Sequence, residues 1–321
     1  MIDMSNLKIA AIVPCHNEEA AIATVVADLR AAVPAMEIFV YDNASTDATV
    51  EVARAAGAVV RHEYTKGKGN VVRRAFADVD ADIYVLIDGD DTYATADLPT
   101  MIATLLEGPY DHVLGVRRQQ EEGAYRPGHE LGNKGFNWLV GGVFKSDVSD
   151  MLSGYRVFSR RFVKSFPALS REFEIETELT VHAMSLRVPQ TEVPVGFKDR
   201  PLGSESKLRT YHDGFRILSL VIELIRHERP LMFYGIAGAV LALIGLILGI
   251  PLVVEFVETG LVPRFPTAIL ALGIVIVAIL AWMIGLILDG VLKARREAGR
   301  LNYLLYSAPP AASGTDPRDV Q

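Results

Sequence analysis

The densest cluster of carboxylates in this sequence follows a short apolar stretch. Residues 83–87 are apolar, and the chain continues with Asp88, Gly89, Asp90 and Asp91. Three carboxylates around one glycine repel one another at neutral pH unless a cation neutralises them. Oxygen ligands suit Mg²⁺ or Mn²⁺, and such an ion can bridge a diphosphate and stabilise it as a leaving group. The motif therefore favours a divalent-metal site over its alternative, an exposed acidic turn.

A second set of polar residues follows the apolar stretch 8–13, at Pro14, His16 and Glu18. A dinucleotide-binding protein would carry a glycine-rich turn here, and the sequence has none; it also lacks a Walker A loop. A proline followed by polar side chains can instead contact a base or a ribose. The alternative is an ordinary strand-to-helix turn whose acidic residues complement the helix N-terminus.

Asp42 ends the next apolar stretch, 37–41, where a carboxylate can accept hydrogen bonds from a base or from ribose hydroxyls. The polar residues at 45–47 are typical helix N-caps, so we expect them to be structural. A Lys-Gly-Lys-Gly loop follows at 66–69. Its glycines allow the backbone to approach a ligand and its lysines attract phosphate, although many such loops are solvated turns.

Two further polar segments lie downstream. The first is Ser-Gly-Tyr-Arg at 153–156, which is followed by a series of glutamates that includes Glu174 and Glu176. The second places Arg200 and Lys207 on a Gly/Ser-containing loop that could close over phosphates. Each segment alone is compatible with a surface charge cluster. Because both occur in the same chain as the acidic motif, a ligand site is favoured.

The elements around these motifs alternate between strand and helix patterns. Strands are predicted at 8–13, 37–41, 58–62, 83–87 and 112–115. Helices are predicted at 19–32, 48–56, 70–79 and 97–106. This alternation predicts an α/β fold with a mostly parallel sheet covered on both faces. Ligands of such sheets bind at the carboxyl ends of the strands, which is where the polar motifs fall.

Two uncharged apolar runs follow, at 231–254 and 267–288. Roughly 20 helical residues cross a hydrocarbon core, so both runs are long enough to span a membrane. The alternative is that both are buried core helices, but the presence of two adjacent runs of this length argues against it. Arginines and lysines flank the outer ends, whereas the connector carries Glu255, Glu258 and Arg264. The positive-inside rule therefore predicts that both termini are cytoplasmic.

The composition fits this division. Hydrophobic residues make up 50% of the chain, which is high for a soluble enzyme and low for an all-membrane protein. The net charge of −7 argues against a nucleic-acid partner. We predict a cytosolic catalytic domain at 1–210, an amphipathic juxtamembrane helix at 211–230, a transmembrane hairpin at 231–290, and a cytosolic basic stretch with a disordered tail at 291–321. The juxtamembrane helix would lie in the membrane interface or pack on the catalytic domain.

The order of these motifs resembles the family 2 glycosyltransferases of the GT-A fold. Within them it is similar to the dolichol-phosphate mannose synthase and polyprenyl-phosphate glycosyltransferase group, whose bacterial members also have a two-helix membrane part. The matching positions are Pro14, Asn17, Glu18, Asp42, 45–47, 67–69, Asp88, Asp90, Asp91, 153–156, Arg200, Gly203, Ser206 and Lys207. Two departures, Asn43 where many relatives have Asp and Thr92 where mannose synthases often have Gln, leave the donor sugar open.

The resemblance implies roles for the matched residues. The nucleoside would contact Pro14, His16, Glu18 and Asp42. Mg²⁺ or Mn²⁺ and the diphosphate would be held by Asp88 and Asp90, with Asp91 in support. Donor phosphates would be neutralised by Lys68, Arg200 and Lys207. The acceptor phosphate would be bound by Arg117, Arg126 and Arg156, and the catalytic group would comprise Asp88, Asp90, Asp91 and Arg156. The alternative for Arg156 is a structural ion pair with a glutamate at 174–178.

The expected reaction is an inverting transfer of a sugar from a UDP- or GDP-linked donor to an undecaprenyl or dolichyl phosphate, at the cytoplasmic face of the inner (plasma) membrane. A phosphate acceptor is already largely dianionic and needs orientation, whereas a lipid hydroxyl would need a base, for which Glu174 and Glu176 are the candidates. The alternatives are a transferase acting on a glycerolipid hydroxyl and a non-catalytic nucleotide-sensing scaffold. A homo-oligomer is compatible with the sequence.

Overall fold

The computed structural model describes residues 7–118, 149–170, 174–198 and 225–309. The chain divides into two compact units. One comprises Met1–Leu208 together with Ala298–Gln321, and the other is Arg209–Glu297.

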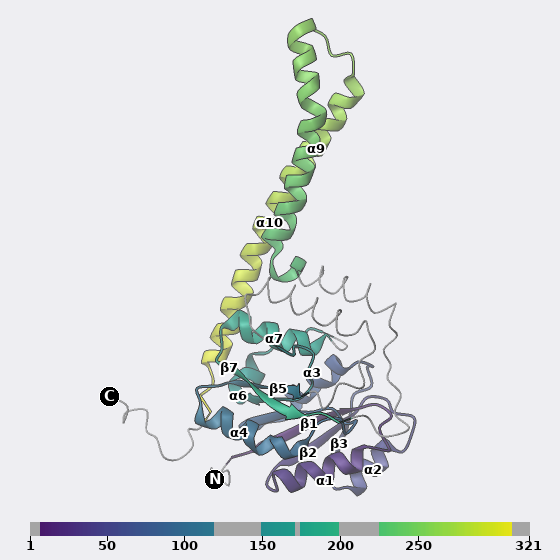
Figure 1. The fold of residues 1–321 in the computed structure, drawn as a ribbon, viewed down its shortest axis with the longest axis vertical. Helices are drawn as coiled ribbons and strands as arrows, with labels where there is room; N and C mark the ends of the chain where they lie inside the picture. Colours follow the sequence, from purple (N-terminus) through teal and green to yellow (C-terminus); the bar gives the residue numbers. More distant parts are fainter. Residues whose placement is uncertain (1–6, 119–148, 171–173, 199–224, 310–321) are drawn as a thin grey trace, which may run out of the picture. The chain divides into compact units, whose positions relative to one another are not determined.

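The first unit is built on a seven-stranded sheet in the order β3-β2-β1-β4-β6-β5-β7 (Figure 1). Its strands are β1 (Ile9–Cys15), β2 (Glu37–Asp42), β3 (Val59–His62), β4 (Ile83–Leu86), β5 (His112–Arg118), β6 (Arg156–Ser159) and β7 (Gln190–Gly196). β1 to β4 are parallel, and β7 is parallel to β5. β6 runs antiparallel to both β4 and β5. The predicted mostly parallel α/β sheet is confirmed.

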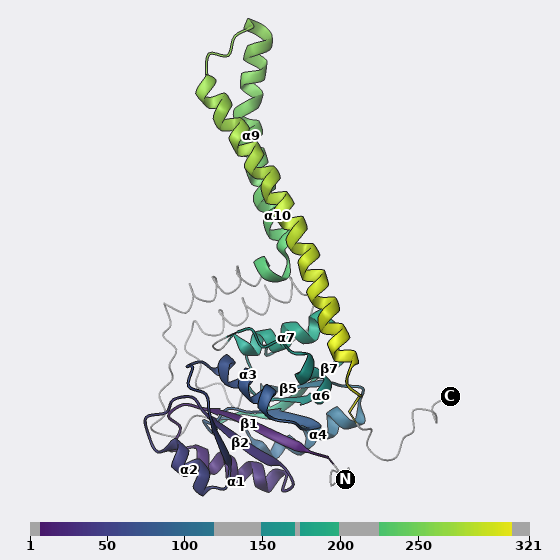
Figure 2. The ribbon, with the colours of Figure 1, turned by 180° about the vertical axis from the view of Figure 1, so that it is seen from behind.

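Helices cover both faces of the sheet, as Figures 1 and 2 show from opposite sides. One face packs on α1 (Ile22–Ala32), α2 (Thr49–Ala55) and α4 (Leu98–Glu107). The other packs on α3 (Lys68–Asp78), α6 (Arg160–Ser165) and α7 (Ile175–Leu186). Successive residues of a strand point to opposite faces, so Ala11 and Val13 join the first apolar cluster while Ala10 and Ile12 join the second. The two clusters hold the sheet rigid, and its carboxyl edge can then position functional side chains.

The C-terminal end of α10 (Phe265–Leu304) also contributes to this unit. Tyr303 is buried, and its hydroxyl donates to Asp111 Oδ2 at 2.7 Å. Arg161 binds both oxygens of the same carboxylate, at 2.5 and 2.7 Å, and the Ser159 hydroxyl donates to it at 2.6 Å. The fully buried charge of Asp111 is therefore compensated by three partners. Residues 291–304, where a basic stretch was predicted, are thus helical, and 310–321 lie outside the described residues.

The second unit contains α9 (Pro230–Thr259) and the first part of α10. Both helices are long and apolar enough to cross a membrane, and 17% of each apolar window is buried, unlike the core helix of a soluble protein. Small residues allow close packing, because a Cβ on Gly238 would collide with the Trp282 ring, whose Nε1 donates to Gly235 O at 3.0 Å. Of the predicted juxtamembrane helix, residues 225–228 are helical and 211–224 lie outside the described residues.

Candidate active site

Three neighbouring strands deliver the polar motifs to one edge of the sheet. β1 lies between β2 and β4 and is parallel to both, with Cys15 beside Asp42 in the register. Pro14, Asp42 and Asp88 therefore emerge at the same carboxyl edge. This is the edge at which open α/β sheets bind their ligands.

Hydrogen bonds join the turns after β1 and β2 at this edge. The Asn17 amide donates to Ser45 Oγ at 3.0 Å, and the Thr46 amide donates to Asn17 Oδ1 at 2.8 Å. The Glu18 amide donates to the Thr49 hydroxyl at 2.8 Å. These bonds fix the direction in which the side chains of the β1 turn leave the sheet.

Asp42 and His16 are two polar residues at this edge of the sheet. The buried Asp42 carboxylate accepts from the Ser45 amide at 3.1 Å and lies 3.2 Å from His62 Nδ1. His16 Nδ1 is buried and has no hydrogen-bond partner among the described residues. No sequence pattern pointed to His62, whose contact with Asp42 arises from strand pairing between β2 and β3.

Asn43 ties the turn after β2 to the loop between β3 and α3. Its side-chain nitrogen donates to Glu63 O at 2.8 Å and to Thr65 O at 2.9 Å, while its Oδ1 accepts from the Gly67 amide at 2.7 Å. An aspartate could accept the last of these bonds but could not donate the first two. The departure noted at this position therefore holds the loop that leads into Lys68.

The three carboxylates of the acidic motif have different surroundings. The Asp88 side chain is 29% exposed. Asp90 is buried and accepts from the Thr92 hydroxyl at 2.7 Å. Asp91 has a left-handed backbone, with φ of 55°, and pairs with Lys198 at 3.0 Å. Thr92, the second departure, thus positions Asp90, and Asp91 anchors the turn.

Lys68 lies between Asp88 and Glu176. Its ammonium group contacts Asp88 Oδ1 and lies 2.5 Å from Glu176 Oε1. Burial alone would lower the pKa of Lys68, but the two carboxylates outweigh it and hold that pKa above its ordinary value. Burial raises the pKa of the Glu176 carboxyl. Of the two candidate bases, Glu176 therefore forms an ion pair with Lys68, and Glu174 is exposed at the N-terminal end of α7.

The donor set fits a divalent ion that is only partly held by protein. Within the described ranges, no three acidic, histidine or cysteine side chains converge into a closed metal cage. Mg²⁺ commonly takes one or two carboxylates and completes its shell with substrate phosphates and water. Asp88 and Asp90, at one strand end and with Asp88 accessible to solvent, match that requirement.

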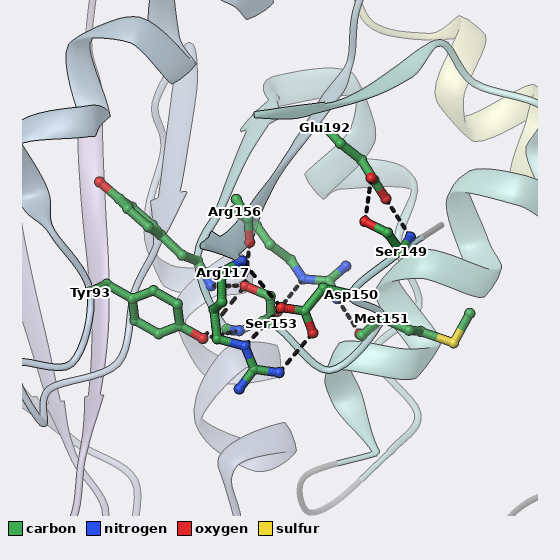
Figure 3. A network of polar contacts seen from close by, with 11 residues as sticks. Tyr93, Arg117, Ser149, Asp150, Met151, Ser153, Arg156 and Glu192 are labelled. Atoms are coloured by element: carbon green, nitrogen blue, oxygen red, sulfur yellow. Dashed lines mark hydrogen bonds and ion pairs between the residues drawn. The ribbon is translucent and has the colours of Figure 1, made fainter. Parts of the chain in front are cut away.

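The Ser-Gly-Tyr-Arg element lies directly against the acidic motif. A Cβ on Gly154 would overlap the Asp88 carboxylate. The Gly154 amide donates to the Tyr93 hydroxyl at 2.9 Å, and the Ser153 hydroxyl donates to Gly115 O at 2.6 Å (Figure 3). The element therefore sets the position of Asp88. Tyr93 was not identified from the sequence, although it follows the acidic motif closely.

The placement of Arg156 contradicts a role in binding the acceptor phosphate. Its side chain is 0% exposed, and its guanidinium donates to Ser153 O at 2.8 Å and to Met151 O at 2.7 Å (Figure 3). It also donates to Thr180 Oγ1 at 2.8 Å. Burial lowers the pKa of this guanidinium to about 10, so it stays charged at neutral pH. Arg156 thus braces the loop before β6 through hydrogen bonds, and none of its side chain is exposed to solvent.

Arg117 remains accessible near the end of β5. Its side chain is 31% exposed and forms a two-bond pair with Asp150, both bonds at 2.7 Å (Figure 3). It also stacks over the Phe197 ring, 5.4 Å from the centroid. The other predicted phosphate ligands, Arg126, Arg200 and Lys207, lie outside the described residues.

Comparison with known proteins agrees with this geometry. The family described as Glycosyl transferase family 2 matches residues 10–166. The glycosyltransferase AglJ of Haloferax volcanii is 32% identical over 286 residues, which cover 88% of this chain and 93% of that protein. An undecaprenyl-phosphate 4-deoxy-4-formamido-L-arabinose transferase of Aeromonas hydrophila is 26% identical over 259 residues, 76% of each chain.

Among solved structures, the glucosyl-3-phosphoglycerate synthase of Mycobacterium tuberculosis is similar, with a TM-score of 0.54 and 25% identity; the match covers 69% of this chain and 80% of that one. The chain belongs to glycosyltransferase family 2. Its catalytic unit has the GT-A fold.

Proposed function

We propose that this glycosyltransferase transfers a sugar from a UDP- or GDP-linked donor to a polyprenyl phosphate, such as undecaprenyl or dolichyl phosphate, with inversion at the anomeric carbon. The observation that supports transfer chemistry most directly is the pair of carboxylates, Asp88 and Asp90, at the carboxyl edge of the sheet. The name of the Aeromonas relative supports the acceptor class.

In this proposal the first two strand ends hold the nucleoside. Pro14, His16, Glu18 and Asp42 surround its base and ribose, with the Asp42 carboxylate accepting from hydroxyl or N–H groups and His16 Nδ1 offering a ring nitrogen. Asp88 and Asp90 hold Mg²⁺ or Mn²⁺, which when bound supplies charge stabilisation to the departing diphosphate. Asp91 supports the turn through Lys198. Lys68, Arg200 and Lys207 neutralise the donor phosphates.

The pairing of Glu176 favours a phosphate acceptor over a lipid hydroxyl. A hydroxyl needs a general base within hydrogen-bond reach, and the carboxylate of Glu176 is already engaged with Lys68 at 2.5 Å. A phosphate monoester, with a second pKa of about 6, is largely dianionic at neutral pH and attacks without losing a proton. Arg117 and Arg126 would orient it through their planar guanidinium groups.

We also propose that α9 and α10 cross the inner membrane, with the catalytic unit and both termini in the cytoplasm. The basic residues flanking the apolar runs support this orientation, and in the connector Glu255 pairs with Arg264 at 2.8 Å. Reporter fusions at Met1 and Gln321 should report a cytoplasmic location and a fusion at Gly260 the opposite side. A periplasmic signal from either terminus would refute the topology.

The test of the reaction is product analysis with the full chain purified in detergent. A panel of UDP- and GDP-sugars is offered with undecaprenyl phosphate or with diacylglycerol, in Mg²⁺ or Mn²⁺. We expect a glycosylated polyprenyl phosphate, no turnover in EDTA, and a rate about two orders of magnitude lower for Asp90→Asn, because lost electrostatic stabilisation is worth ~3 kcal/mol. A product formed with diacylglycerol but not with undecaprenyl phosphate would support the alternative of a hydroxyl acceptor. The absence of turnover with every donor would support the alternative of a non-catalytic scaffold.

A further inference from the structure

Lys68 joins two carboxylates from distant parts of the chain. It begins α3, whereas Asp88 follows β4 and Glu176 lies in the first turn of α7. The Lys68 side chain is 8% exposed, so solvent screens its contacts weakly. Its ammonium group therefore occupies one oxygen of the carboxylate that the proposed function assigns to the metal.

We infer that Lys68 is a built-in counter-ion of Asp88, held there by Glu176, and that the divalent ion enters the site together with the donor's diphosphate rather than alone. The inference rests on the proposed function, because it concerns the metal and the donor named there. It adds an order of binding and a positioning role for Glu176.

The electrostatic argument starts from the approach of a metal ion by itself. Such an ion must share Asp88 with an ammonium group, and like charges at contact distance repel strongly in a partly buried site. A diphosphate brings negative charge that the ion and the ammonium can share. The flexible stem of lysine also allows the ammonium to turn from Asp88 towards a phosphate, which a rigid guanidinium fork would do less readily.

Glu176 determines how strongly the ammonium opposes the metal. It is buried, and its Oε2 has no hydrogen-bond partner in the described part of the chain, so its contact with Lys68 is its main polar interaction there. With Glu176 charged, the three groups carry a net charge of about −1, which still attracts a cation. Without that charge, Lys68 and Asp88 form a neutral pair, and of the two proposed metal ligands only Asp90 still attracts a metal ion.

The experiment measures Mn²⁺ binding, not activity. Free Mn²⁺ is followed by electron paramagnetic resonance during titration of the full chain in detergent, alone and with UDP or GDP. For the wild type we expect Mn²⁺ to bind about tenfold or more tightly with one of the nucleotides than alone. Lys68→Met should tighten the binding of Mn²⁺ alone by about tenfold and remove most of the nucleotide's advantage.

Glu176→Gln should change Mn²⁺ binding in the opposite direction and weaken the affinity for Mn²⁺ alone several-fold. Glu174→Gln, an exposed change at the same end of α7, should leave it unchanged. Opposite signs at Lys68 and Glu176 distinguish a counter-ion from a merely structural pair, in which both changes would weaken binding.

Two results would overturn the inference. The first is a folded Lys68→Met variant, checked by thermal melt, that binds Mn²⁺ alone no more tightly than the wild type. The second result applies if Lys68→Met does not fold. It is a Glu176→Gln variant that binds Mn²⁺ alone as tightly as the wild type does. Failure of the proposed function looks different, since Asp90→Asn would then bind Mn²⁺ with nucleotide as well as the wild type does.

Discussion

Gly154 lies against Asp88 so closely that a single methyl group on Gly154 would overlap the Asp88 carboxylate. The φ angle of Gly154 is not positive, so any residue could adopt its backbone conformation. The position therefore requires glycine for space. Gly154 precedes β6 and Asp88 follows β4, two strands that are antiparallel neighbours. The Ser-Gly-Tyr-Arg element therefore acts on the acidic motif through packing.

Replacing this glycine should inactivate the enzyme without unfolding it. In Gly154→Ala the Asp88 carboxylate must move, and a misplacement of about 1 Å at a catalytic centre can cost ~100-fold in rate. We expect kcat/KM to fall by about that factor, with a thermal melting temperature near that of the wild type. Gly290→Ala is the matched control, because a Cβ there meets no atom within 4 Å. A Gly154→Ala variant with the kcat/KM of the wild type would show that catalysis does not depend on the present position of the Asp88 carboxylate.

Asn43→Asp should weaken the loop before Lys68. The change removes the two donated bonds to Glu63 O and Thr65 O and places a negative charge beside both carbonyl oxygens. Leaving a buried polar group without a partner costs about 1–3 kcal/mol, and these bonds are only partly buried, so the combined cost should be near the lower end of that range. We expect a lower melting temperature and a higher KM for the donor.

The control for this prediction is Asn302→Asp, which makes the same chemical change at an exposed side chain. It should leave both quantities unchanged. An Asn43→Asp variant with wild-type stability and donor KM would mean that the loop does not depend on these hydrogen bonds.

Arg156→Lys should reduce stability and leave recognition of the lipid intact. One ammonium cannot reach the three acceptors now served by Nε, Nη1 and Nη2, and breaking a buried charged network typically costs 3–5 kcal/mol. We expect a lower free energy of unfolding from denaturant titration, with an unchanged KM for the lipid in the folded fraction. Arg117→Lys is the contrasting variant, for which the lipid KM should rise; because the Arg117 side chain is 31% exposed, its loss of stability should be smaller than that of Arg156→Lys. The reverse pattern would restore Arg156 as an acceptor ligand.

Stability should also fall with pH through a histidine. Burial lowers the pKa of His182 to about 4, and its Nε2 lies 3.2 Å from the Ser165 hydroxyl. The unfolded chain, with an ordinary histidine pKa of about 6.5, binds the proton more readily. The stabilisation from neutral His182 is therefore fully present above about pH 6.5 and is lost as the pH falls towards 4, about 3 kcal/mol in all.

Denaturant titrations of the wild type and His182→Gln between pH 7 and pH 4 test this. The variant should show a shallower dependence of unfolding free energy on pH, whatever its absolute stability. Equal slopes for the two proteins would show that His182 is not the group responsible.

The parts of the fold predicted from sequence are those that depend on local pattern. The stretches 8–13, 37–41 and 83–87 coincide closely with β1, β2 and β4, because buried strands read as short apolar runs. The acidic motif was recognisable for the same reason, since Asp88 and Asp90 are adjacent to the strand that positions them. Parallel neighbours bring their carboxyl ends together without any further information.

What the sequence could not supply is the burial that comes from distant pairing. Arg156 appeared to be a phosphate ligand because it stands in a polar motif, yet β6 inserts between β4 and β5 and encloses it. The pairing of Lys68 with Glu176 depends in the same way on the approach of α3 to α7. Residue type alone does not distinguish a buried arginine from an exposed one.

The hydrogen bond from Tyr303 to Asp111 has a consequence for the order in which the protein is made. The ribosome completes both apolar runs, 231–254 and 267–288, before it reaches Tyr303 near the end of α10. The catalytic unit therefore receives one of its buried hydrogen bonds only after both runs have been synthesised. Until then, of the three partners of Asp111, only Arg161 and Ser159 have been synthesised. Completion of the enzyme is therefore tied to completion of its hairpin, and a chain cut off after residue 210 would be missing part of its own core.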